Sequence, residues 1–227
     1  NKYLLLGNKF DYNFWKKRFP DTNIIITGYL KYDKYWLNKI IRKNKFKNKK
    51  IIYISYSGYI SKYIFEKYED LTIKIIKICS NLKNVKTIFK IHPMTNENVL
   101  KKILKNYPQK NLEISKKNQL NLVKNSDIFV SLYSSASNMD GLALGKIPLE
   151  LWNVMKDQKL QSKFKKLNLS IPIQNGNELK NKINLFLNND FSKFNLRYKK
   201  KFLSKNFIFD GSVNSARKKI LNILYHN

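Results

Sequence analysis

A histidine followed by a proline is the pair of residues in this sequence best placed for chemistry. His92 ends the apolar run 87–91, and Pro93 follows it. Proline has a fixed φ angle and disfavours helical geometry in the residue before it, so the pair holds the imidazole at a strand end. Such a histidine can donate to a phosphate or transfer a proton near neutral pH, whereas the alternative is a purely structural histidine. We predict that His92 is catalytic and that Pro93 lies beside a bound nucleotide.

Hydroxyl groups are concentrated in the segment 131–141, whose pattern is typical of a strand-to-helix turn. Ser134, Ser135 and Ser137 fall within four positions. A helix that starts near Ser137 or Asn138 presents free N–H groups and the positive end of its dipole to a phosphate, and hydroxyls add further donors. A helix cap alone would need only one of the three serines. We therefore predict that all three serines bind phosphate groups of a substrate.

Two carboxylates accompany this turn. Asp140 lies in the first turn of the expected helix, and Glu150 lies near the end of the next apolar run. In nucleotide-binding folds, a carboxylate near the cleft accepts hydrogen bonds from the ribose hydroxyls. The alternative for Asp140 is that it only complements the helix dipole. We predict that Asp140 and Glu150 contact a ribose.

Several motifs that identify other classes of protein are missing from the sequence. It has no glycine-rich dinucleotide fingerprint, no Walker motif and no paired cysteines or histidines at metal-ligand spacing, which argues against oxidoreductases, ATPases and zinc enzymes. It also lacks the basic and aromatic motif of RNA-binding sheets. We expect no metal and no cofactor, and predict a cleft for a nucleotide or another phosphorylated group.

The elements that must position these loops alternate along the chain. We expect short strands that are apolar on both faces at 3–6, 24–27, 50–55, 87–91, 128–132 and 147–151. We expect helices at 35–43, 66–82, 97–106, 118–124, 138–144, 178–187 and 213–225. Strand followed by helix, repeated, predicts an α/β fold with a doubly wound, mostly parallel, Rossmann-like sheet. Ligands bind such sheets at the carboxyl ends of the strands, so we also place Gly58, after the third strand, at the phosphate site.

The 227 residues include 45 Lys+Arg against 15 Asp+Glu, a formal net charge of +30. Of the basic residues 41 are Lys, and Asn occurs 30 times, which indicates a composition bias more than selection for phosphate recognition by arginine. We expect no specific nucleic-acid partner, although the lysines suit an anionic membrane surface. A hydrophobic content of 43 % predicts a folded core that contains Cys79, the single cysteine, and excludes a disordered chain.

Four segments, in order, resemble a known family. Residues 24–33 (IIITGYLKYD) resemble its "vtGyPryD" segment, 89–93 (FKIHP) its "KxHP" segment, 126–135 (SDIFVSLYSS) its "sDilItDYSS" segment and 209–217 (FDGSVNSAR) its terminal "DGkaseRi" element. The chain thereby resembles the C-terminal domain of GT-B type transferases of the CDP-glycerol glycerophosphotransferase (teichoic acid polymerase) and capsule-polysaccharide group. Leu30 and Leu132 depart from the family's Pro and Asp, and 140–146 (DGLALGK) resembles the "EAxaxGkP" element of nucleotide-sugar GT-B enzymes.

The resemblance implies a donor linked to CDP, CMP or UDP. Its phosphates would lie against the turn 134–137 and near His92, and its ribose against Asp140. His92 or a nearby lysine would offset charge that develops on the leaving phosphate. Residues 1–40 would lead in from a missing N-terminal domain that supplies the acceptor and its base, and 41–227 would form the donor-binding domain with C-terminal helices.

The function implied is a glycosyl- or glycerophosphotransferase of bacterial surface or capsular polysaccharide synthesis. Its acceptor would be a polysaccharide or a lipid-linked molecule. The enzyme would lie in the cytoplasm, peripheral to the inner membrane. Two alternatives stay open. One is an isomerase like UDP-N-acetylglucosamine 2-epimerase, which shares the GT-B fold, and the other is a non-enzymatic binder of nucleic acid through lysine runs such as 43–50.

Overall fold

The computed structural model describes residues 2–9, 11–40, 50–56, 65–93, 95–107, 111–132, 135–151, 163–188 and 216–226. The chain divides into two compact units, of which the first comprises Asn1–Ile41 with Phe194–Asn227 and the second comprises Arg42–Lys193. The first division lies one residue from the boundary expected at residue 40. Residues 194–227, which we expected in the donor-binding domain, are grouped with the N-terminal unit.

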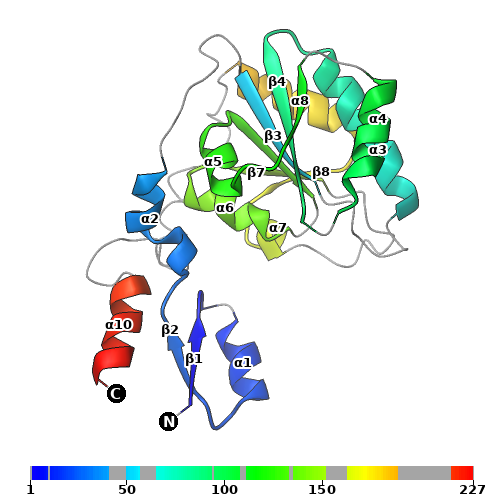
Figure 1. Ribbon diagram of the computed structural model, residues 1–227. Coiled ribbons are helices and arrows are strands. Elements are labelled where there is room, and N and C mark those ends of the chain that lie inside the picture. The colour runs from blue at the N-terminus through cyan, green and yellow to red at the C-terminus, as the bar shows by residue number, and fades with distance from the viewer. Residues whose placement is uncertain are drawn as a thin grey trace. The chain divides into compact units, whose positions relative to one another are not determined.

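The second unit contains a six-stranded sheet in which every pairing between neighbouring strands is parallel (Figure 1). Its strands are β3 (Lys50–Tyr56), β4 (Val85–Ile91), β5 (Leu112–Ser115), β6 (Ile128–Leu132), β7 (Pro148–Leu151) and β8 (Ile171–Ile173). They are arranged in the order β5-β4-β3-β6-β7-β8. Counted within this unit the order is 3-2-1-4-5-6, that of dinucleotide-binding folds, so the predicted doubly wound parallel sheet is confirmed.

Helices cover both faces of this sheet (Figure 1). They are α3 (Phe65–Ser80), α4 (Glu97–Asn106), α5 (Gln119–Lys124), α6 (Ser137–Ala143), α7 (Lys163–Lys166) and α8 (Gly176–Leu187). Helices α3 and α8 contact each other, as do α5 and α6. Asparagine caps begin three of the helices, because the side chains of Asn96, Asn118 and Asn175 each accept a hydrogen bond from a backbone N–H of the first turn.

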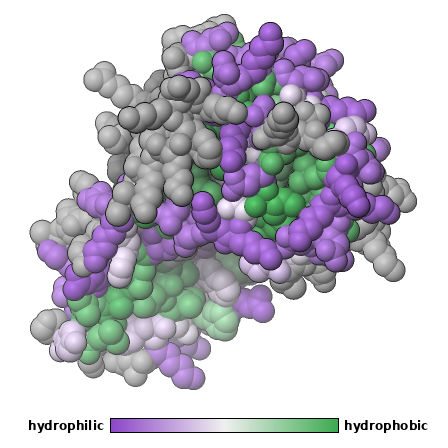
Figure 2. Space-filling model, turned by 45° about the horizontal axis from the view of Figure 1, so that its top comes forward, coloured by the Kyte–Doolittle hydropathy of each residue, from purple (hydrophilic) through white to green (hydrophobic). Residues whose placement is uncertain are grey.

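The core of the second unit lies on both faces of the central strands. In β3, Ile51 to Ile54 are all buried, as expected for a strand covered on two sides. In α3, Ile75 and Cys79 are buried, which confirms that the cysteine is a core residue. Hydrophilic residues frame the apolar areas that remain on the surface (Figure 2).

The first unit contains a two-stranded parallel sheet of β1 (Tyr3–Leu6) and β2 (Asn23–Ile26). Its helices are α1 (Tyr12–Arg18), the 3₁₀ turn η1 (Leu30–Tyr32), α2 (Lys34–Lys39) and α10 (Ala216–His226). Helix α10 joins this unit through two hydrogen bonds: the Arg217 N–H donates to Asp33 Oδ2 at 3.4 Å, and Lys219 Nζ donates to the Ile26 carbonyl at 3.3 Å. These bonds give a physical reason why the C-terminal residues are grouped with it.

All six predicted strands are present with ends shifted by at most two residues, and all seven predicted helices are present with shifts of up to four. The sequence patterns missed β5, β8, α1 and α7, each of seven residues or fewer. None of the helices that the structure describes is long and apolar enough to cross a lipid bilayer.

Candidate functional site

The order of the strands changes direction at one position in the sheet. Strands β3 and β6 lie side by side at the centre, and the chain continues from β3 to β4 on one side and from β6 to β7 on the other. The two connections therefore diverge, and ligands of such sheets bind at the carboxyl ends of the strands where this happens. The segments that follow β3 and β6 begin with residues 57 and 133, and the predicted phosphate ligands Gly58 and Ser134 lie outside the described residues.

His92 and Pro93 follow β4, the neighbour of β3 in the sheet, and both are exposed. The His92 N–H donates to the carbonyl of Tyr56, the last residue of β3, at 2.8 Å. The His92 carbonyl accepts from the Thr95 N–H at 2.8 Å and closes a turn. The backbone of His92 is thus tied to the end of a central strand, as the proline after it led us to expect, and its side chain is open to solvent.

Two of the predicted serines lie together after β6. The hydroxyls of Ser135 and Ser137 are 2.7 Å apart, and Ser135 Oγ also accepts from the Ser137 N–H at 3.3 Å. Helix α6 begins at Ser137 after Ala136, which has no side chain able to cap it. The hydroxyls therefore orient each other, and Ser135, which is only partly buried, is the more accessible of the two.

Asp140 lies in α6 with 1 % of its surface exposed. Its Oδ2 accepts a hydrogen bond from Nε2 of Gln119, the first residue of α5, at 2.5 Å. Burial, and secondly the Asp140 carboxylate, raise the pKa of the Tyr53 phenol in β3, while the Ser55 hydroxyl opposes the shift. The carboxylate thus belongs to a polar network beneath α6 that sequence reasoning did not find, because nothing local pairs Gln119 or Tyr53 with Asp140.

Glu150 lies one residue before the end of β7 and is completely buried. Its Oε2 accepts from the Ser170 hydroxyl at 2.5 Å. Glu150 is the register partner of Ser131 in β6, so both belong to the same level of the sheet. The structure thus places this carboxylate inside the sheet layer, and its contact with a ribose stays a prediction.

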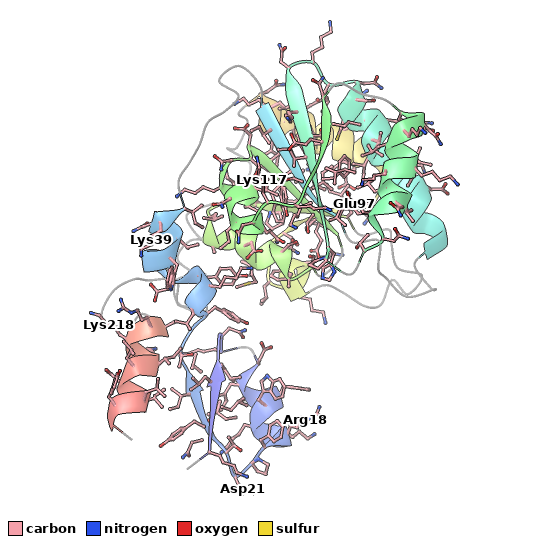
Figure 3. All side chains as sticks on the ribbon, in the orientation of Figure 1. Arg18, Asp21, Lys39, Glu97, Lys117 and Lys218 are labelled. Carbon is pink, nitrogen blue, oxygen red and sulfur yellow. The ribbon has the colours of Figure 1, made fainter. Side chains whose placement is uncertain are left out.

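An ion-pair cluster links two segments at the same edge of the sheet. Glu97, at the start of α4, accepts from Lys101 and from Lys116, which follows β5, each at 2.9 Å. The hydrogen bonds from Lys116 and Lys101 lower the pKa of the Glu97 carboxyl. Glu97 and Lys117, the neighbour of Lys116, are labelled in Figure 3. No cluster of His, Cys, Asp and Glu fit to hold a metal ion occurs among the residues that the structure describes.

No protein-family model and no curated protein matches this chain. Solved structures do match. UDP-GlcNAc 2-epimerase from Methanocaldococcus jannaschii, in complex with UDP-GlcNAc and UDP, superposes with a TM-score of 0.60 at 14 % identity, over 100 % of this chain and 62 % of that one. The Neisseria meningitidis UDP-GlcNAc 2-epimerase bound to UDP-GlcNAc gives 0.58 at 15 % identity, over 100 % and 61 %.

TarM gives a TM-score of 0.52 at 13 % identity, over 97 % of this chain and 43 % of TarM. The chain therefore spans between two fifths and two thirds of these structures. The similarity shows that the chain shares the α/β fold of the part of these GT-B structures that it covers, as the resemblance predicted. At these sequence identities the similarity does not show that the chain belongs to the CDP-glycerol glycerophosphotransferase group.

Proposed function

We propose that this chain is the donor-binding part of a GT-B enzyme that acts on a nucleotide-activated donor. The observation that carries the proposal is the 3-2-1-4-5-6 sheet, with His92 and Ser135 after the carboxyl ends of β4 and β6, the two neighbours of β3. Two structures with the same fold bind UDP-GlcNAc. A nucleotide diphosphate at this edge would have hydroxyl and imidazole donors for its phosphates.

In the transfer that we propose, an acceptor hydroxyl forms a bond to the transferred group and gives its proton to a base. The bond between that group and the nucleotide phosphate breaks, and negative charge develops on the leaving phosphate. His92 would donate a hydrogen bond or a proton to it, and the hydroxyls of Ser135 and Ser137 would bind its oxygens. Asp140 would accept from the ribose. Because only 1 % of Asp140 is exposed, a ribose can reach it only if α6 or its neighbours shift. Gly58, Ser134, Pro93 and Glu150 complete the proposed set.

The group transferred would be a sugar or glycerol phosphate that extends a bacterial surface or capsular polysaccharide. Its acceptor, and the base that activates it, would come from a further domain, consistent with structures of the same fold of which this chain covers 61 % and 62 %. The net charge of +30 would favour the anionic inner face of the cytoplasmic membrane, where each lysine near the surface contributes about 1 kcal/mol.

A second candidate is an isomerase that epimerises a UDP-sugar. The observation in its favour is that two of the structures described above are UDP-GlcNAc 2-epimerases. The two activities differ in their products, because transfer releases the nucleotide, whereas the product of epimerisation is again a UDP-sugar. Incubation of the natural protein with UDP-GlcNAc, followed by chromatography of the nucleotide products, distinguishes them.

Titration calorimetry with CDP, CMP and UDP tests the binding site that both candidates share. We expect saturable binding of at least one nucleotide, weakened tenfold or more by His92→Ala and by Ser135→Ala. Ser80→Ala is the matched control, because the Ser80 hydroxyl bonds only within the end of α3, to the Lys77 carbonyl. If the unmodified protein binds none of the three, the proposed function is wrong.

A further inference from the structure

Two polar side chains where α6 packs on β6 are completely buried and make no hydrogen bond within the described part of the chain. They are Ser131, in the central strand β6, and Asn138, in the first turn of α6. Among the residues that the structure describes, neither the Ser131 hydroxyl nor either amide atom of Asn138 has a partner. Burying such groups unpaired is unfavourable, and native proteins contain few of them. An apolar residue at either position would fold more favourably, so another role for the two is expected.

The packing of α6 on β6 places the two side chains at the same level. A Cβ added to Gly141 would lie 2.6 Å from the Phe129 ring, so Gly141 packs directly on that residue. Asn138 precedes Gly141 by three residues and shares its helix face, while Ser131 follows Phe129 by two and shares its strand face. Because a helix that connects parallel strands runs antiparallel to them, both steps lead toward the carboxyl end of β6.

This level of the sheet is polar across neighbouring strands. Ser131 is in register with Glu150 of β7, and Ser55 of β3 follows Ile54, the register partner of Val130. One level below, the rings of Tyr53 and Phe129 stack with centroids 5.3 Å apart in the apolar core. The change from apolar to polar therefore occurs where the sheet meets the proposed donor site.

The hydrogen-bonding capacity of these unpaired atoms indicates which chemical group of a ligand they can bind. An amide and a hydroxyl each offer a donor and an acceptor and carry no charge. A phosphate oxygen only accepts, so it would leave the amide oxygen of Asn138 unpaired. The neutral hydroxyl groups of a sugar both donate and accept, so two neighbouring hydroxyls can pair with the amide oxygen, the amide nitrogen and Ser131 together.

We infer that Asn138 and Ser131 bind neighbouring sugar hydroxyls of the nucleotide-linked donor, an assignment that rests on the proposed function. The ligand would reach them by displacing the first turn of α6. That turn has no side-chain cap at Ala136, and the N–H groups of Asn138 and Met139 bond to carbonyls three residues back, at 3.0 and 3.1 Å. The buried amide would thus remain unpaired in the free protein and be paired in the complex.

Asn138→Leu tests the inference, because the free and bound states should respond in opposite directions. The melting temperature of the free variant should rise by at least about 2 °C, since an unpaired amide is removed. The dissociation constants of UDP and UDP-GlcNAc should rise at least tenfold, while that of inorganic pyrophosphate, which has no sugar, stays unchanged. Asn121→Leu, at an exposed position of α5, is the matched control and should alter none of these.

Three results would overturn the inference while leaving the proposed function intact. They are unchanged UDP affinity in Asn138→Leu, a lowered melting temperature, or an equal loss of affinity for pyrophosphate. Failure of the unmodified protein to bind any nucleotide would instead refute both proposals. Ser131→Ala removes a single oxygen and provides an independent second test, in which UDP binding should weaken at least threefold. Unchanged UDP affinity in this variant would likewise overturn the inference.

Discussion

Replacing Gly141 with alanine should destabilise the second unit, although alanine is the better helix former. Gly141 lies inside α6, and a Cβ built there would lie 2.6 Å from Cδ1 and 2.8 Å from Cε1 of Phe129. The two groups would have to separate by about 0.9 Å to reach the roughly 3.5 Å at which carbon atoms pack best. The ring of Phe129 has little room to move, because it is 1 % exposed and stacked on Tyr53.

The expected change in the free energy of unfolding combines two opposing effects. Overpacking of a close-packed core costs about 1–3 kcal/mol, and replacing glycine by alanine within a helix returns about 1 kcal/mol. The net loss should therefore reach up to about 2 kcal/mol. Gly176→Ala is the matched control, because a Cβ at the start of α8 would meet Ile78 Cδ1 at an ordinary 3.4 Å. That variant should be as stable as the unmodified protein, or more stable by up to about 1 kcal/mol.

Urea unfolding followed by far-UV circular dichroism measures both variants. Hydrogen exchange of peptides from β6 and α6 assigns the change to the second unit, since each unit can unfold separately. The two variants should differ by about 1–3 kcal/mol, with Gly141→Ala the less stable. If Gly141→Ala were as stable as Gly176→Ala or more stable, α6 would not pack on Phe129 as described.

Two further predictions concern ionisable groups of the second unit. Burial raises the pKa of the Cys79 thiol to about 12. A disulfide reagent at pH 8 should therefore label this thiol only as fast as the protein unfolds. Rapid labelling in the absence of urea would contradict the burial of Cys79. The pKa of the Glu97 carboxyl is lowered from its ordinary value of 4.5. Its ion pair with Lys116 therefore stabilises the folded state fully above pH 4.5, and this stabilisation is lost as the pH falls through the lower pKa of the folded state. Lys116→Met should therefore lower the urea midpoint of unfolding at pH 7 but not at pH 2. Lys102→Met, the control, should lower the midpoint at pH 7 by less. An equal effect of Lys116→Met at both pH values would exclude the ion pair as the cause.

The larger elements could be predicted from the sequence because their apolar patterns are local. Strands such as 128–132 and helices such as 97–106 were predicted with their observed ends. The missed strands are short and carry mixed signals. β5 (Leu112–Ser115) contains a glutamate, and β8 (Ile171–Ile173) has a proline at its middle position. Both lie at the edges of the sheet, where proline is tolerated, and it is the neighbouring strand that makes them strands.

The sequence by itself determined the alternation of strands and helices, and with it which loops follow the strands of a parallel sheet. It thus identified His92, Ser135 and Ser137 as candidates. Only the tertiary structure decided how much of each polar side chain is exposed to solvent. Asp140 is buried against Gln119, 21 residues away, and Glu150 against Ser170, 20 residues away. Burial depends on what packs against a side chain, and for both carboxylates those atoms come from elements that local sequence patterns do not connect.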